Sequence, residues 1–244
     1  KVYRFFNHPT KLILGFFVVT MCVGAVIFWK SRCISWEETV ISQENKKEPV
    51  KDTSIVYISN CFVGSDMTAH AFDSLVEKVN EKKPDVILFG GNLFGRHTKE
   101  VTVDKTLASI KKMKAALGIY MVEGSADSAL VEEKKEKISG AGVHLLLDES
   151  AVLHNGFQLV GCRADGKTKK PMSYTLSLIN KEKPSIVLAG ETMEEKRKEE
   201  KKISLVLYPK KITDTGNGGT SGVNQMFPRN VLASAKINFI QIKK

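Results

Sequence analysis

Short apolar runs that alternate with amphipathic helical stripes constrain the fold of this chain more than any other feature. The runs Ser54–Ser59, Asp85–Phe89 and Gly118–Glu123 are rich in β-branched and aromatic residues, as in strands that are buried on both faces. Between the first two runs, from Phe72 to Val79, apolar residues recur at spacings of three and four, which predicts a helix. Repeated strand–helix units of this kind predict an α/β domain.

The second half of the chain adds antiparallel pairing to this pattern. Asn155 and Gly156 separate the short runs Ala151–His154 and Phe157–Gly161, and an Asn-Gly pair between two such runs predicts a β-hairpin. Further strands are expected at Val143–Leu147, Ser185–Leu188, Ile203–Leu207 and Ile237–Ile242, and further helices at Leu107–Leu117, Val131–Ile138, Tyr174–Ile179 and Glu191–Lys202. We therefore predict two packed mixed sheets flanked by helices, forming one domain over residues 53–244.

A charge-free segment near the N-terminus predicts a membrane anchor. Leu12–Trp29 contains no charged residue and is bracketed by lysines, and a helix of this length spans about 27 Å, close to the hydrocarbon thickness of a bilayer. A buried core helix would show a polar face, and a signal peptide would have a shorter apolar region followed by small residues. We expect a transmembrane helix within residues 1–32, then a polar linker over residues 33–52.

Basic residues near this segment favour one orientation. Lys1, Arg4 and Lys11 precede it, whereas Lys30 and Arg32 follow it. Because basic residues are enriched on the cytoplasmic side, this difference favours a cytoplasmic N-terminus. We expect a single-pass protein of the cell membrane with an extracytoplasmic domain.

The excess of positive charge is spread along the chain. The formal net charge is +10, and most of the excess comes from lysines in many separate segments. No stripe interleaves basic and aromatic residues, so we expect solvated faces and no specific nucleic-acid partner, with binding of anionic lipid as the alternative.

The cysteines form no metal-binding pattern. Cys22, Cys33, Cys61 and Cys162 include no C-x-x-C pair, which argues against a zinc knuckle. We expect buried free thiols, and a disulfide between Cys61 and Cys162 is the alternative.

The junctions that follow the predicted strands are where ligands bind in α/β folds. Four of them are Ser59–Gly64 (SNCFVG), Gly90–Phe94 (GGNLF), Gly124–Asp127 (GSAD) and Ala189–Thr192 (AGET). In order and spacing they resemble the motifs of the calcineurin-like metallophosphoesterases of the small membrane-associated bacterial type. Those motifs read S-D-x-H-x-G, G-D-L, G-N-H-D, a lone histidine after a strand, and G-H-x-H. The resemblance covers residues 54–244 and implies a four-layer sandwich.

The chain departs from this family at the positions that carry its chemistry. The family's metal ligands and catalytic histidine correspond here to Asn60, Phe62, Asn92, Ser125, Ala126 and Gly190. The final G-H-x-H is missing, since Leu205–Leu207 runs into Tyr208–Lys211. Asp127 is retained, and we expect it to form hydrogen bonds within its turn.

These replacements argue against a metal centre. Two divalent ions bring four positive charges, which anionic oxygens must offset, and an Asn side chain carries no charge, while Phe, Ala and Gly offer no side-chain ligand. Hydrolysis in the family uses a metal-bound hydroxide, so we expect no catalytic residue, no bound metal and no cofactor.

These expectations lead to three hypotheses for the function. The first is a membrane-anchored, catalytically inactive domain that acts as an interaction or scaffold subunit beside another membrane protein. The second is a divergent metal-dependent phosphohydrolase that uses Asn60, Asn92, Asp127, Asp165 or a residue from a loop near Lys211 that this sequence does not contain. The third is a lysine-rich binder of anionic lipid or polymer.

Overall fold

The computed structural model describes residues 13, 15–22, 37–42, 52–164, 170–180, 182–191, 205–209, 231–234 and 237–243. The chain divides into two compact units, Lys1–Ser35 and Trp36–Lys244. In the first unit, residues 15–22 are helical, and the side chains of Phe16, Phe17 and Met21 are exposed. Across the described ranges, no helix combines the length and apolar character that crossing a bilayer requires. Half of the predicted span Leu12–Trp29 lies outside those ranges.

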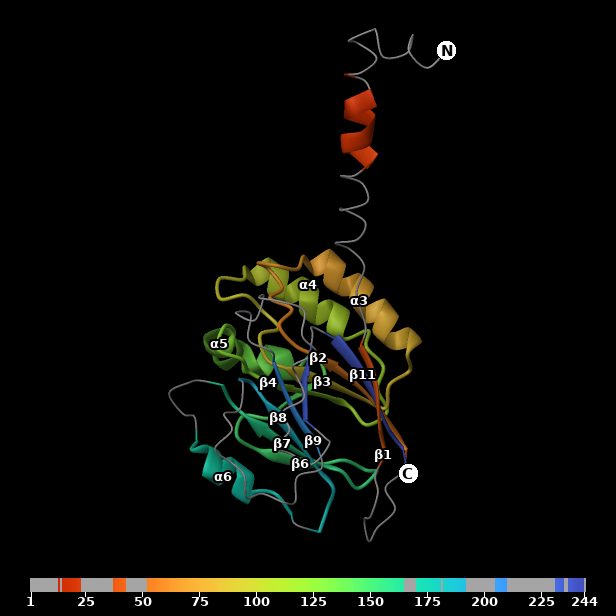
Figure 1. Ribbon diagram of the computed structural model, residues 1–244. Coiled ribbons are helices and arrows are strands. Elements are labelled where there is room, and N and C mark those ends of the chain that lie inside the picture. The colour runs from red at the N-terminus through yellow and green to blue at the C-terminus, as the bar shows by residue number, and fades with distance from the viewer. Residues whose placement is uncertain are drawn as a thin grey trace. The chain divides into compact units, whose positions relative to one another are not determined.

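The second unit contains two mixed β-sheets (Figure 1). The first sheet has the strand order β1-β11-β2-β3-β4-β5. Its strands are β1 (Glu37–Ser42), β2 (Thr53–Ile58), β3 (Val86–Gly90), β4 (Ile119–Val122), β5 (Val143–Leu145) and β11 (Ile237–Lys243). β2 to β5 are parallel, β11 is antiparallel to β2, and β1 is parallel to β11.

The second sheet has the strand order β10-β9-β8-β7-β6. Its strands are β6 (Ser150–Val152), β7 (Gln158–Cys162), β8 (Ser185–Ala189), β9 (Leu205–Pro209) and β10 (Val231–Ser234). β6 pairs antiparallel with β7, and the remaining pairs are parallel. This arrangement confirms the predicted α/β class with two mixed sheets flanked by helices.

The main core lies between the two sheets. Alternate residues of β2, β3 and β4, such as Tyr57 and Leu88, pack with alternate residues of β7, β8 and β9, such as Leu159, Leu188 and Leu207. Side chains alternate between the two faces of a strand, so each sheet also presents a second apolar face.

Helices cover those outer faces. They are α3 (Ala69–Glu81), α4 (Glu100–Ile110), α5 (Ser128–Ser139) and α6 (Met172–Ser177). α3 and α4 pack side by side (Figure 1). The ring of Phe72 on α3 stacks on that of Phe89 in β3, with 6.4 Å between the ring centroids. Leu176 of α6 packs on the outer face of the second sheet with Val160 and Val187.

The predicted hairpin is confirmed. Val152 of β6 pairs with Gln158 of β7, and Gly156 in the turn has a φ of 96°, which favours glycine. The amide of Asn155 also donates a hydrogen bond to Thr53 Oγ1 at 2.9 Å, which links the turn to β2.

The structure differs from the predictions at several elements. Glu37–Ser42, within the predicted linker over residues 33–52, form β1 at the sheet edge, and Val231–Ser234 form β10, which was not predicted. α4 ends at Ile110, before the predicted limit of Leu117. The predicted helix over Glu191–Lys202 lies outside the described residues, Glu191 excepted.

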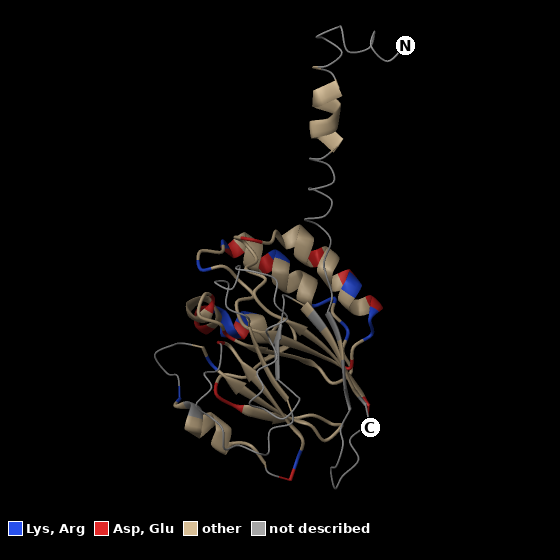
Figure 2. Cartoon of the chain, viewed as in Figure 1, with Lys and Arg blue, Asp and Glu red and all other residues tan. Residues whose placement is uncertain are grey.

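The structure also bears on the predictions made for the cysteines and for the distribution of charge. Cys61 and Cys162 are buried and form no disulfide, so the alternative of a disulfide between them is wrong. Over the part that the structure describes, basic and acidic residues are intermixed on the helices, and no single-sign stripe stands out (Figure 2).

Candidate functional site

The carboxyl ends of β2, β3 and β4 converge on one hydrogen-bonded cluster, which contains positions that the resemblance matches to metal ligands. Asn92 Nδ2 donates to Asn60 Oδ1 at 2.8 Å, and both residues are buried. The Phe62 N–H donates to the Asn92 carbonyl at 2.9 Å, and the Ala126 N–H donates to Asn92 Oδ1 at 2.9 Å. We call Asn60, Phe62, Asn92, Ala126 and Asp127 the strand-end cluster. Ser125 is exposed beside it.

Three members of the strand-end cluster have left-handed backbone conformations. The φ angles are 53° at Asn60, 46° at Phe62 and 54° at Asn92. Asn adopts this region at little cost, whereas a bulky residue such as Phe is strained there. Hydrogen bonds hold Phe62 in place, since its carbonyl accepts from the N–H groups of Ser65 at 2.9 Å and Asp66 at 3.0 Å. Strained residues of this kind collect at functional positions.

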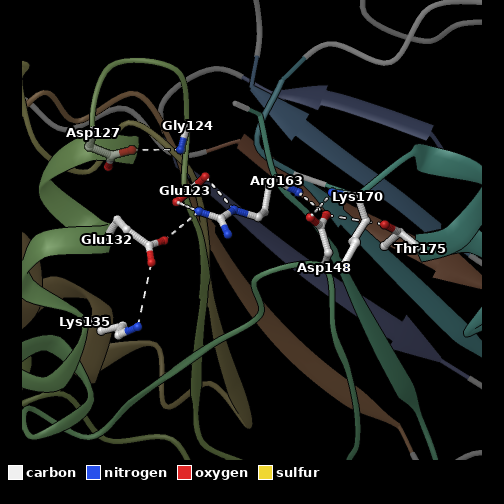
Figure 3. Close-up of polar contacts among 9 residues, drawn as sticks. All are labelled: Glu123, Gly124, Asp127, Glu132, Lys135, Asp148, Arg163, Lys170 and Thr175. Atoms are coloured by element: carbon white, nitrogen blue, oxygen red, sulfur yellow. Dashed lines mark hydrogen bonds and ion pairs between the residues drawn. The ribbon is translucent and has the colours of Figure 1, made fainter. Parts of the chain in front are cut away.

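Asp127 uses both carboxylate oxygens to hold backbone groups. Oδ1 accepts from the N–H groups of Gly124 at 2.7 Å and Asn92 at 3.3 Å, and Oδ2 accepts from those of Leu93 at 2.7 Å and Phe94 at 3.3 Å (Figure 3 shows the bond to Gly124). Burial raises the pKa of Asp127 to about 6, and the four N–H groups oppose that rise. This carboxylate organises the turn and the end of β3.

Gly190 lies where the resemblance expects a histidine, and the backbone leaves no space for a side chain. A Cβ built on Gly190 would lie 1.8 Å from the Glu123 carbonyl oxygen and 3.0 Å from the Ala164 nitrogen. Gly91 is equally close-packed, because its Cβ would lie 2.9 Å from the Gly124 Cα. The ends of β3, β4 and β8 therefore approach each other through backbone atoms.

Gly190→Ala is expected to lower the free energy of unfolding by about 2–3 kcal/mol, since one methyl group displaces a packed backbone carbonyl. Urea unfolding of the full chain, followed by circular dichroism, measures the change. Gly140→Ala is the control, because Gly140 has an ordinary helical φ of −65° and its Cβ would lie 3.2 Å from the nearest atom, the Glu136 carbonyl oxygen, so the variant should change stability by less than about 1 kcal/mol. A neutral Gly190→Ala variant would contradict the close packing.

An ion-pair network lies beside the strand-end cluster (Figure 3). Arg163, at the end of β7, donates from Nε to Glu123 Oε1 at 2.7 Å and from Nη2 to Glu123 Oε2 at 3.1 Å. Its Nη2 also donates to Glu132 Oε2 of α5 at 2.8 Å. The side chains of Arg163 and Glu123 are buried, whereas that of Glu132 is partly exposed. The network joins the two sheets and α5.

Asp148 extends these contacts to the other side of Arg163. Its Oδ1 accepts from the Arg163 N–H at 3.1 Å and from Thr175 Oγ1 of α6 at 3.3 Å, and its Oδ2 accepts from the Lys170 N–H at 2.8 Å. Glu123 thus holds the side chain of Arg163, and Asp148 holds its backbone N–H from the opposite direction (Figure 3).

Burial and pairing shift the carboxyl groups of the network in opposite directions. Burial raises the pKa of Glu123, and hydrogen bonds from Arg163 oppose this rise. For the more exposed Glu132, the hydrogen bond from Arg163 lowers the pKa. At Glu123 the effect of desolvation on the pKa is therefore larger than that of the hydrogen bonds. Because its side chain is buried, the charged form of Glu123 depends on Arg163 for stabilisation.

The sequence did not predict this network. Glu123 directly follows an apolar strand, and Arg163 directly follows another, so two opposite charges at the ends of buried strands are the signal that identifies such a pair. Within the described residues, no three His, Cys, Asp or Glu side chains form a group able to hold a metal ion.

Comparisons with known proteins find solved structures of low similarity to this chain. The chain is similar to the crystal structure of TT1561 of Thermus thermophilus, with 18% identity over 66% of this chain and 83% of that chain, and a TM-score of 0.48. A second solved structure is 15% identical over 59% of this chain and 72% of its own, with a TM-score of 0.44. No protein-family model matches, and no curated protein matches. Similarity at this level carries no argument about function.

Proposed function

We propose that this chain is a membrane-anchored, catalytically inactive metallophosphoesterase-like protein that acts as an interaction subunit beside another membrane protein. The observation that carries the proposal is the pairing of Asn60 with Asn92 at 2.8 Å. The amide of Asn92 donates a hydrogen bond at the position where the resemblance expects a carboxylate that bridges two cations. An N–H donor repels a cation, so this pairing opposes metal binding at that point.

Two neighbouring features support the loss of catalysis. The oxygens of Asp127 each accept two N–H groups, which occupies them as hydrogen-bond acceptors. Gly190 supplies no ligand, and its Cβ position is blocked by the Glu123 carbonyl. Without metal ions, water keeps its bulk pKa and provides no hydroxide at neutral pH.

The proposed anchor rests on the N-terminal apolar segment. Its helical residues expose large apolar side chains, including Phe16, Phe17 and Met21, and lipid tails would remove these from water. An anchor concentrates the folded domain near other proteins of the same membrane, which strengthens weak binding without new contacts.

A metal-loading experiment tests the loss of catalysis. The full chain, purified in detergent and incubated with Mn²⁺ or Fe²⁺, is expected to bind no stoichiometric metal and to hydrolyse bis(p-nitrophenyl) phosphate no faster than buffer. The Asn60→Asp, Asn92→Asp double variant restores two carboxylates and should remain inactive, because Phe62, Ala126 and Gly190 still provide no ligand or acid. Two ions per chain with turnover in the unmodified protein would overturn the proposal.

The interaction role has a separate test. Affinity purification from detergent-solubilised membranes should recover a membrane protein together with the chain in a constant ratio. Recovery of this chain alone would refute the interaction role and leave the loss of catalysis unaffected.

A further inference from the structure

A groove between α3 and α4 has the size of a small-molecule site. Its volume is about 710 Å³, and its polar lining includes Ser65, Thr68, His70, Thr102, Lys105 and Ser109. No member of the strand-end cluster lines this α3–α4 groove. Its volume lies within the range of about 300–1,000 Å³ that is typical of ligand pockets.

The one acidic side chain in the lining of the α3–α4 groove is neutralised. Asp73 Oδ1 accepts hydrogen bonds from Lys112 Nζ and Ser109 Oγ, both at 2.7 Å. These two bonds, that from Lys112 first, lower the pKa of Asp73. Asp73 and Lys112 therefore contribute no net charge to the α3–α4 groove.

Lys105 leaves the α3–α4 groove positive. Its side chain is exposed and, among the residues that the structure describes, pairs with no acidic group. Thr102 and Lys105, one turn apart on α4, line the same space. A cation beside hydroxyl groups in a concave site is the chemistry that binds an oxyanion.

The first turn of α3 adds to the positive electrostatic potential of the α3–α4 groove. Thr68 caps the helix by accepting the Ala71 N–H at 3.1 Å, and no acidic residue lies in the first turn. No carboxylate of the first turn therefore offsets the positive end of the helix dipole, where Ala69 and His70 line the α3–α4 groove.

We propose that the α3–α4 groove binds a small organic molecule that carries a phosphate or phosphonate group. Lys105 and the first turn of α3 hold the anion, and Met67 and Ala108 offer apolar surface to the organic part. A bare inorganic anion would use only a fraction of this volume, so an organic phosphate binds more tightly than inorganic phosphate. This proposal goes beyond the interaction role and does not depend on it.

A titration with phenylphosphonate tests the α3–α4 groove. The carbon–phosphorus bond resists phosphoesterase hydrolysis, so the result is independent of any catalytic activity. We expect ³¹P NMR of the full chain in a phosphate-free detergent to give a dissociation constant on the order of 1 mM. Inorganic phosphate should bind more weakly, benzyl alcohol should not bind, and raising NaCl from about 20 to 300 mM should weaken binding severalfold.

Matched lysine variants locate the site. Lys105→Gln should weaken phenylphosphonate binding by about fivefold or more. Lys111→Gln removes an exposed charge at the end of α4, outside the lining of the α3–α4 groove, and should leave the constant unchanged. Equal weakening by both variants, or no binding, would overturn the proposal.

Hydrogen exchange separates the α3–α4 groove from the strand-end cluster. Phenylphosphonate should slow exchange in residues 64–73 and 102–112. Protection confined to residues 60–62 and 92–94 would place the ligand at the strand ends and overturn the proposal. The metal-loading test of catalysis does not depend on this result.

Discussion

Arg163→Met is expected to lower the free energy of unfolding by about 4 kcal/mol. The substitution leaves Glu123, whose side chain is buried, without its bidentate partner, and an unpaired buried charge typically costs about 3–5 kcal/mol. Burial already raises the pKa of Glu123, so the variant should take up a proton at this group more readily than the unmodified protein. Urea unfolding at pH 7 measures the loss.

A second variant separates the lost pairing from lost packing. Glu123→Gln combined with Arg163→Met removes both charges, and it should recover at least about half of the stability that the single variant loses. Lys135→Met is the control, because the pair that Lys135 makes with Glu132 at 3.7 Å is exposed, so the variant should change stability by less than about 0.5 kcal/mol. A double variant as unstable as Arg163→Met would show that packing accounts for the effect.

Asp127→Ala is expected to lower the free energy of unfolding by about 4 kcal/mol at pH 7. The variant leaves four backbone N–H groups at the ends of β3 and β4 without their acceptor, and each unsatisfied buried donor costs about 1–3 kcal/mol before water enters. Asp127→Asn keeps the shape but presents an amide N–H₂ to two of these donors, so it should lose about 2–3 kcal/mol. Asp66→Ala, at an exposed turn residue, should change stability by no more than about 0.5 kcal/mol.

The effect of Asp127 should also depend on pH. Burial raises its pKa from 3.8 to about 6, so the folded protein binds this proton more tightly than the unfolded chain. Its contribution to stability is therefore complete below about pH 4 and is lost as the pH rises through about 6, by roughly 3 kcal/mol in total. The difference in stability between the unmodified protein and Asp127→Asn should grow from pH 7 to pH 4. A pH-independent difference would contradict the raised pKa.

The sequence predicted the strands whose burial is strongest. Apolar runs identified β2, β3 and β4, because strands covered on both faces consist almost entirely of apolar residues. A search for apolar runs does not find β1, because this strand begins with the polar residues Glu37, Glu38 and Thr39. β1 lies at the sheet edge, where polar residues are tolerated. β10 was not predicted, because only its first two residues, Val231 and Leu232, are large and apolar.

The positions of the candidate site were predictable, but its contacts were not. Strand exits identified Asn60, Asn92 and Asp127, because parallel strands end at one edge of a sheet. The pairing of Asn60 with Asn92 depends on left-handed φ angles at both residues, which a spacing pattern does not reveal. The Arg163–Glu123 pair joins different sheets, so only the tertiary fold brings the two residues together.

The position of β1 determines how the folded unit responds to mechanical load. Among the strands that the structure describes, β1 is the first after the boundary at Ser35, and it pairs along its length with β11 and with no other. Tension transmitted along the preceding chain therefore reaches β1 before any other strand. A pull along the axis of β1 loads its hydrogen bonds to β11 in shear, because those bonds run across the strand direction. If β1 detached, β11 would become the new sheet edge, with its hydrogen-bonding groups open to another strand.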